Sequence, residues 1–255
     1  MKTLSFFNEK GGVGKSLHTV MFASWLQYAQ GARVAVFDLE CPAPRLDGIR
    51  RRELLQLEDP DSVLSRYFLR HPRPEPLFDI FTKEPLLQRF SRENIYTLHR
   101  ELWDFLNGNP GGYDYVLFDF PGILTTDSPA YDVIASGMVD LVSVPIDTDN
   151  VTRKSGLITA CMARDNEQRV VVFWNNVSTA EIARPGYLES GERVFTEHGI
   201  EVLPHRVKAF LKARRDSDER LFVRSTVCWP DAYVRMACRA LVPFYEEIRK
   251  RLDSM

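Results

Sequence analysis

The stretch Asn8–Ser16 reads NEKGGVGKS, a glycine-rich segment with a lysine at each side of its glycines. It follows a continuous apolar run, Thr3–Phe7, and opens a helical pattern from about Lys15 to Gln30 that Gly31 ends. Glycines at a strand-to-helix turn let backbone N–H groups close around phosphate oxygens, and the helix N-terminus adds positive potential. This stretch therefore predicts a phosphate-binding loop.

The loop contains one lysine at the position that a phosphate-binding loop requires and a second lysine at an unusual position. Lys15 is expected to pair with the β- and γ-phosphates of a nucleotide, and Ser16 to offer its hydroxyl to Mg²⁺. The common pattern GxxxxGK[ST] needs a glycine where this chain has Glu9, and a second lysine, Lys10, directly precedes the glycines instead. The residues expected to line the nucleotide are Gly11, Gly12, Val13, Gly14, Lys15, Ser16 and Leu17.

Further short apolar runs along the chain indicate more buried strands. They are Arg33–Leu39, Tyr115–Phe118, Leu141–Ile146, Val170–Trp174 and a weaker one at Glu201–Leu203. Fully apolar strands separated by helices are typical of a parallel sheet covered on both faces. The sequence therefore predicts an α/β fold with a doubly wound, mostly parallel sheet, whose ligands bind at the carboxyl ends of the strands. We expect one domain over residues 1–255.

Residues 43–112 fit the alternation of strands and helices poorly. Two pieces of this region, 46–57 and 93–107, have helical patterns, and a proline-rich stretch, 71–76, lies between them. A surface excursion on one side of the sheet explains this pattern, and a partner-specific insertion is the alternative. A final helix is expected from about residue 230 to 253, since Pro230 suits the first turn of a helix.

Composition narrows the class of protein. The chain has 255 residues, of which 44% are hydrophobic and 27% charged, with a net charge of -2, so neither disorder nor binding through bulk charge is indicated. The longest run without a formal charge, Ser16–Ala32, contains several polar residues and is no membrane span. The N-terminus lacks the pattern of a secretion signal, and none of the four cysteines has CxxC spacing. We expect a cytoplasmic protein.

The KGGVGKS arrangement resembles the deviant Walker A motif of the ParA/MinD family of P-loop ATPases. In that family the early lysine reaches across a nucleotide-sandwich dimer to the phosphates held by the other subunit, and Lys10 matches its position. A lysine there adds positive charge where the transferring phosphoryl group develops negative charge. The resemblance implies ATP and Mg²⁺ as cofactors, a homodimer that forms on ATP, and slow ATP hydrolysis.

Two acidic strand ends match further elements of that family. Asp119 follows Tyr115–Phe118 and precedes the sequence FPG at 120–122, the family's Walker B form, so it is expected to hold Mg²⁺ through water. Asp38 and Glu40 stand where the family has D-x-D, which implies that Glu40 positions the attacking water and Asp38 supports Mg²⁺ or the loop hydroxyl. Two alternatives stay open: Glu40 is a solvated edge residue, or Asp38 positions the water.

Base recognition and DNA binding are also implied by the resemblance. Asn175 follows a strand where the family has an asparagine whose amide pairs with adenine, and Pro204 matches an apolar-Pro element beside the base. ATP-bound family dimers bind DNA without sequence preference, through phosphate contacts. The run Arg206–Arg224, with seven basic and three acidic residues, is the candidate DNA surface, and a solvated helical face is the alternative. Its basic residues are Arg206, Lys208, Lys212, Arg214, Arg215, Arg220 and Arg224.

Three stretches resemble the ParA-type proteins of Bacteroidetes conjugative elements more specifically. They are FDFPG at 118–122, FWN at 173–175 and VRSTVCWP at 223–230. This resemblance implies an ATPase of a plasmid or transposon, acting in partition, maintenance or conjugal transfer. A ParB-like or transfer-apparatus protein would be its partner, and the ATP-bound form would associate with the nucleoid.

Three other functions stay open. MinD-like membrane positioning needs an amphipathic C-terminal tail with a basic face, whereas Glu246 and Glu247 offset the basic residues of this tail. Its apolar residues Phe244, Ile248 and Leu252 are four apart and favour a core-packing helix, so no stable membrane insertion is expected. A metabolic ligase on the same scaffold would need a second substrate site. A non-catalytic nucleotide switch would fit the presence of Glu40 where the family has an aspartate.

Overall fold

The computed structural model describes residues 1–40, 45–62, 65–66, 69, 77–82, 92–122, 125–208 and 232–254. The strands are β1 (Lys2–Phe6), β2 (Val34–Asp38), β3 (Asp79–Thr82), β4 (Tyr115–Asp119), β5 (Leu141–Ile146), β6 (Arg169–Val177) and β7 (Glu201–Lys208). The helices are α1 (Lys15–Gln30), α2 (Arg45–Glu58), α5 (Arg92–Gly108), α6 (Pro129–Ala135), α7 (Asn150–Asp165), α8 (Thr179–Ile182), α9 (Tyr187–Thr196) and α11 (Ala232–Asp253).

The strands form one seven-stranded sheet in the order β3-β2-β4-β1-β5-β6-β7. Every neighbouring pair is parallel, so all carboxyl ends meet at one edge of the sheet. β2, β3 and β4 lie on one side of β1, and β5, β6 and β7 lie on the other. The winding therefore reverses at β1, the place where open α/β sheets bind their ligands. The predicted doubly wound parallel sheet is confirmed.

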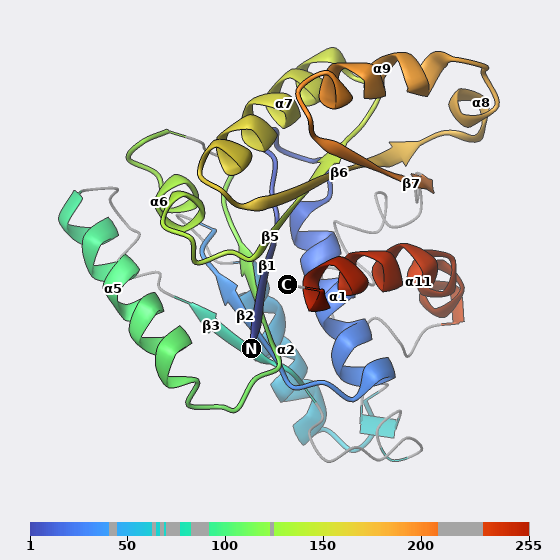
Figure 1. Cartoon of the computed structure of the whole chain (residues 1–255). Coiled ribbons are helices and arrows are strands. Elements are labelled where there is room, and N and C mark those ends of the chain that lie inside the picture. Colours follow the sequence, from blue (N-terminus) through green and yellow to red (C-terminus); the bar gives the residue numbers. More distant parts are fainter. Residues whose placement is uncertain are drawn as a thin grey trace.

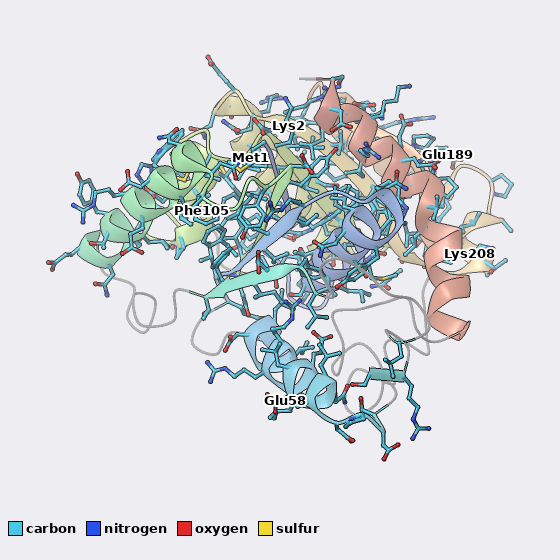
Figure 2. All side chains as sticks on the ribbon, turned by 90° about the horizontal axis from the view of Figure 1, so that it is seen from below. Met1, Lys2, Glu58, Phe105, Glu189 and Lys208 are labelled. Atoms are coloured by element: carbon cyan, nitrogen blue, oxygen red, sulfur yellow. The ribbon has the colours of Figure 1, made fainter. Side chains whose placement is uncertain are left out.

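Helices cover both faces of this sheet (Figure 1). On one face, α1, α2 and α11 pack in a core cluster with strand residues such as Leu4 and Val36. On the other face, α5, α6, α7 and α9 pack with strand residues such as Phe37 and Val144. Viewed from below, α5 with Phe105 and α11 lie on opposite sides of the sheet (Figure 2). Val36 and Phe37 point to opposite faces because side chains alternate along a strand.

Residues 43–112 contribute more to the sheet than the sequence indicated. The two predicted helices are present as α2 and α5, each close to its predicted bounds. Between them lies a strand that was not predicted, β3, whose residues Asp79–Thr82 pair in parallel with Ala35–Asp38 of β2. The interpretation of this region as a surface excursion was therefore incomplete, because its strand β3 forms one edge of the sheet. The proline-rich stretch 71–76 lies outside the described residues.

The last predicted helix is present as α11, although its expected start near residue 230 lies outside the described residues. Phe244, Ile248 and Leu252 are 2%, 0% and 0% exposed, which confirms the prediction of a core-packing helix. The hydroxyl of Tyr115 donates to Asp253 Oδ1 at 2.7 Å and fastens the end of α11 to β4. Among the helices within the described ranges, none combines the length and the apolar character that crossing a bilayer requires.

Candidate functional site

The glycine-rich loop joins β1 to α1 at the carboxyl edge of the sheet. Gly12 and Gly14 have φ angles of +77° and +93°, a left-handed backbone that favours glycine. No side chain caps the start of α1, and its first turn contains no acidic residue. The first N–H groups of α1 therefore keep their positive potential, which favours an anion at this end of the helix.

The two lysines of the loop lie in different surroundings. Lys15 is only 8% exposed, and its ammonium donates a hydrogen bond to the backbone carbonyl of Lys10 at 3.1 Å. This contact folds the Lys15 side chain back across the loop. The side chain of Lys10 is exposed. One ammonium is thus held within the loop, and the other lies on a residue that is exposed to solvent.

Asn8 fixes the loop to the neighbouring strand and helix. Its amide nitrogen donates to the carbonyl of Pro145 at 2.8 Å and to that of Thr152 at 3.3 Å. Its amide oxygen accepts from the backbone N–H of Lys10 at 2.9 Å and from the hydroxyl of Ser155 at 2.7 Å. The loop is therefore tied to the end of β5 and to the first turn of α7. No role was predicted for Asn8, although its position at a buried strand end inside the motif was a usable signal.

A buried carboxyl group, Asp119, faces the loop from the end of β4. It is 0% exposed, and neither of its oxygens has a hydrogen-bond partner of normal geometry in the described part of the chain. Burial raises the pKa of Asp119 to about 8, and the negative charge of Asp38 adds to this, while the nearby Ser16 hydroxyl and Lys15 ammonium oppose it. A buried acid without a partner is costly, so this position suits a bound cation or its water.

Asp38 ends the neighbouring strand, in register with Asp119. Its oxygens accept backbone N–H bonds from Leu46 at 2.7 Å, Asp47 at 3.2 Å and Glu40 at 3.3 Å. Burial raises its pKa to about 6 in spite of these bonds. Asp38 therefore holds the first turn of α2. The charge of half-buried Glu40 also raises the pKa values of Asp38 and Asp119, so three acids gather here.

Gly122 brings the segment after β4 against the loop. A Cβ atom on Gly122 would lie 2.7 Å from the carbonyl oxygen of Glu9 and 3.2 Å from the Lys15 ammonium. The rings of Phe7 and Phe120 pack edge to face, 5.8 Å apart, and hold the two backbones together. No side chain fits at this approach, which is the physical reason for a glycine there.

Asn175 reaches the loop from β6. Its amide nitrogen donates to the carbonyl of Val13 at 2.7 Å, and its amide oxygen lies 3.1 Å from Nε2 of His18. Both ends of the amide are thus engaged within the chain, and the residue is 4% exposed. A contact between Asn175 and adenine stays a prediction. Pro204 lies exposed on the neighbouring strand, β7.

The structure describes two members of the predicted DNA surface. Arg206 forms an ion pair with Glu192 and donates to the carbonyl of Leu203 at 3.1 Å. Glu192 also accepts from the indole N–H of Trp174 at 2.7 Å, so the charge of Arg206 is used within the fold. Lys208 is exposed at the end of β7. The remaining basic residues lie outside the described ranges: Lys212, Arg214, Arg215, Arg220 and Arg224.

The same sequence matches a family model described as the CobQ/CobB/MinD/ParA nucleotide binding domain over residues 4–214. The chain belongs to this family. The match includes the loop, the two strand-end acids and Asn175. The structure agrees with this assignment, because it places the loop and the two acids at one edge of the sheet, as a nucleotide-binding domain requires.

Solved structures share this fold at low sequence identity. MinD of Pyrococcus furiosus is 18% identical, with a TM-score of 0.62, and the alignment covers 98% of both chains. A pNOB8 ParA bound to nonspecific DNA is 18% identical, with a TM-score of 0.61 and 99% of each chain covered. A plasmid partition protein of Borrelia burgdorferi bound to AMPPNP is 13% identical, with a TM-score of 0.61, and covers 96% of this chain and 99% of its own.

A curated relative matches only part of the chain. A nucleolar complex protein 2 homolog of Caenorhabditis briggsae is 26% identical over 136 residues, which are 51% of this chain. The match spans 17% of that protein's length. This similarity therefore concerns a segment and carries no argument about function.

Proposed function

We propose that the chain is an ATPase switch of ParA type, which binds Mg·ATP, dimerises on it and hydrolyses it slowly. The observation that carries this proposal is the buried Lys15 ammonium, held across the glycine loop within reach of the unpartnered carboxyl of Asp119. A triphosphate supplies the negative charge that this ammonium and the uncapped end of α1 favour. A magnesium ion supplies the positive charge that Asp119 favours.

The residues present fit Mg²⁺ held jointly with phosphate. In the described part of the chain, no three His, Cys, Asp or Glu side chains come together in a way that could hold a metal ion. Mg²⁺ bound with nucleotides commonly uses one or two protein oxygens, phosphate oxygens and water. The Ser16 hydroxyl and the Asp119 carboxyl are the two protein oxygens we assign to it, with Asp119 acting through water. When bound, the ion would neutralise charge on the phosphates.

Removing the Asp119 charge should stabilise the ligand-free protein. The pKa of Asp119, about 8, exceeds its ordinary value of 3.8, so between these pH values the folded state keeps a proton that the unfolded chain releases. The free energy of unfolding therefore falls as pH rises through this window. Asp119→Asn removes that loss, and we expect its melting temperature to exceed the wild type's by about 5 °C or more at pH 8. The difference should shrink toward pH 5.

The same variant tests the metal assignment. Thermal unfolding with AMPPNP should show a further stabilisation by Mg²⁺ in the wild type, which EDTA removes, and no such increment in Asp119→Asn. An unchanged magnesium increment in Asp119→Asn would contradict its role beside the ion.

The water-positioning role falls to Glu40 in our proposal. Both oxygens of Asp38 accept backbone N–H groups and hold the start of α2, which supports the assignment of the attacking water to Glu40 instead of Asp38. Its side chain reaches one methylene further than an aspartate, so a water would be held with a different geometry. This difference supports a slow intrinsic turnover, and we propose separately that a partner protein stimulates it.

DNA binding and cellular role extend the proposal. A ParA of similar fold is described as bound to nonspecific DNA, and a partition protein of similar fold as bound to AMPPNP. We propose that the ATP-bound dimer contacts duplex DNA through Lys208 and the basic residues at 212–224, without Arg206. Partition or conjugal transfer of a mobile element, with a ParB-like or transfer-apparatus partner, is the proposed process. The site of action would be the cytoplasm, on the nucleoid when ATP is bound.

One set of measurements tests this proposal. Size-exclusion chromatography should give a dimer with Mg·AMPPNP and a monomer with Mg·ADP. The dimer alone should shift a duplex DNA of arbitrary sequence, and added salt should weaken the shift. Equal DNA binding with both nucleotides at low salt would refute the switch, and a monomer with AMPPNP would refute the dimer.

A further inference from the structure

His18 is a polar residue in apolar surroundings, one turn into α1. It is 1% exposed, and its ring centroid lies 5.4 Å from that of Phe6, 5.2 Å from Phe173 and 5.7 Å from Phe244. A buried imidazole in such surroundings is costly unless its nitrogens find hydrogen-bond partners. The partners of His18 therefore show what the residue connects.

Each ring nitrogen of His18 has one partner. Nε2 lies 3.1 Å from Asn175 Oδ1, and Nδ1 lies 3.2 Å from the hydroxyl of Tyr245 on α11. Because the Asn175 nitrogen donates to Val13, its oxygen must accept from His18. The network thus assigns the proton to Nε2, and Nδ1 accepts from Tyr245. Burial lowers the pKa of His18 to about 4, in keeping with a neutral ring.

We propose that His18 is a positioning residue that couples the phosphate loop to the C-terminal helix: through Asn175 it holds the loop at Val13, and through Tyr245 it holds α11. Three consecutive hydrogen bonds, all donating in the same direction, make this connection. The inference deepens the proposed function and rests on nucleotide binding by the loop.

Close packing makes the connection stiff where it meets the loop. A Cβ atom on Gly14 would lie 2.6 Å from the amide nitrogen of Asn175 and 3.5 Å from Cδ2 of His18. The loop therefore cannot move toward these side chains without displacing them, because packed interiors transmit such shifts. A change in the loop on phosphate binding would reach Tyr245 through the same contacts.

Thermodynamic linkage makes the coupling reciprocal. Whatever holds Tyr245 in place favours the loop shape that binds nucleotide, and bound nucleotide strengthens the attachment of α11. In the sequence, residues 225–231 separate α11 from the basic run Arg206–Arg224. The coupling thus reaches the helix that comes after the segment that we propose for DNA binding.

Two matched substitutions test this inference, and each removes one tyrosine hydroxyl that attaches α11 to the rest of the fold. Tyr245→Phe removes the hydroxyl that reaches His18, whereas Tyr115→Phe removes a hydroxyl that bonds α11 at Asp253 and leads away from the loop. Calorimetry with Mg·AMPPNP should show an affinity about fivefold or more weaker for Tyr245→Phe, and within about twofold of the wild type for Tyr115→Phe. Both variants should lose some stability, so stability alone does not distinguish them.

Hydrogen exchange gives a second readout. In the wild type, Mg·AMPPNP should increase the protection of amides around residue 245, and in Tyr245→Phe this increase should be lost. After Asn175→Ala breaks the connection, adding Tyr245→Phe should cause no further change in affinity. Wild-type affinity and wild-type protection in Tyr245→Phe would refute the coupling alone. Failure of the wild type to bind Mg·AMPPNP would refute the proposed function, and this inference with it.

Discussion

Replacing Lys15 with alanine should weaken Mg·AMPPNP binding by about 100-fold or more, because the charge-assisted bonds of a buried ammonium to phosphate are among the strongest in a protein. Lys15 is 8% exposed and lies across the loop, so its charge is poorly screened by water. The free protein loses the bond to the carbonyl of Lys10 and the favourable charge interaction with Asp119. Isothermal titration calorimetry at fixed ionic strength would measure the loss.

The matched control for this prediction is Lys154→Ala. Lys154 is an exposed lysine on α7, and its removal changes the net charge of the protein by the same amount. We expect its affinity to stay within about twofold of the wild type, as surface charges contribute little. Thermal unfolding would verify that both variants are folded. If folded Lys15→Ala bound Mg·AMPPNP with an affinity within threefold of the wild type, the assignment of this loop as the triphosphate site would be wrong.

The sequence predicted most of the sheet because its strands are buried on both faces. The run Leu141–Ile146 is apolar except for Ser143, all six residues are buried, and the structure has β5 at those bounds. β3 was missed because Asp79–Thr82 is a short edge strand whose residues are half-buried or exposed, so it has no apolar run. The end of β7 was missed for a related reason: Pro204 and Arg206 interrupt its apolar pattern, although both lie within the strand.

The loop and the acids of the site were predictable because their signals are local. Gly14, Lys15 and Ser16 are contiguous, and Asp119 directly ends a buried strand. The contacts of His18 were not predictable, since it meets Asn175 and Tyr245 across 157 and 227 residues of sequence. Asn175 reaches His18 from β6, and Tyr245 reaches it through the packing of α11 on α1. A single sequence carries no periodic pattern for such pairs.

Lys10→Ala should separate nucleotide binding from dimerisation. The Lys10 backbone accepts from the Lys15 ammonium and donates to Asn8, and both contacts survive loss of the exposed side chain. We therefore expect the monomer to bind Mg·ADP with an affinity within about threefold of the wild type, because only a remote charge is removed. The dimer with Mg·AMPPNP should be lost in analytical ultracentrifugation.

Hydrolysis should fall with the dimer, by about 100-fold or more, because a cation supplied across an interface stabilises the charge that develops during phosphoryl transfer. Turnover measured at several protein concentrations distinguishes this role from a contact within one subunit. The wild type should gain specific activity as concentration rises through the dimerisation range, and Lys10→Ala should stay at its low level throughout. Lys154→Ala, which also lacks one exposed lysine, should follow the wild type. If Lys10→Ala dimerised and hydrolysed ATP normally, Lys10 would have no role across the dimer. Lys15 would then be the only lysine of the loop that acts on the phosphates, and each subunit would hydrolyse ATP independently.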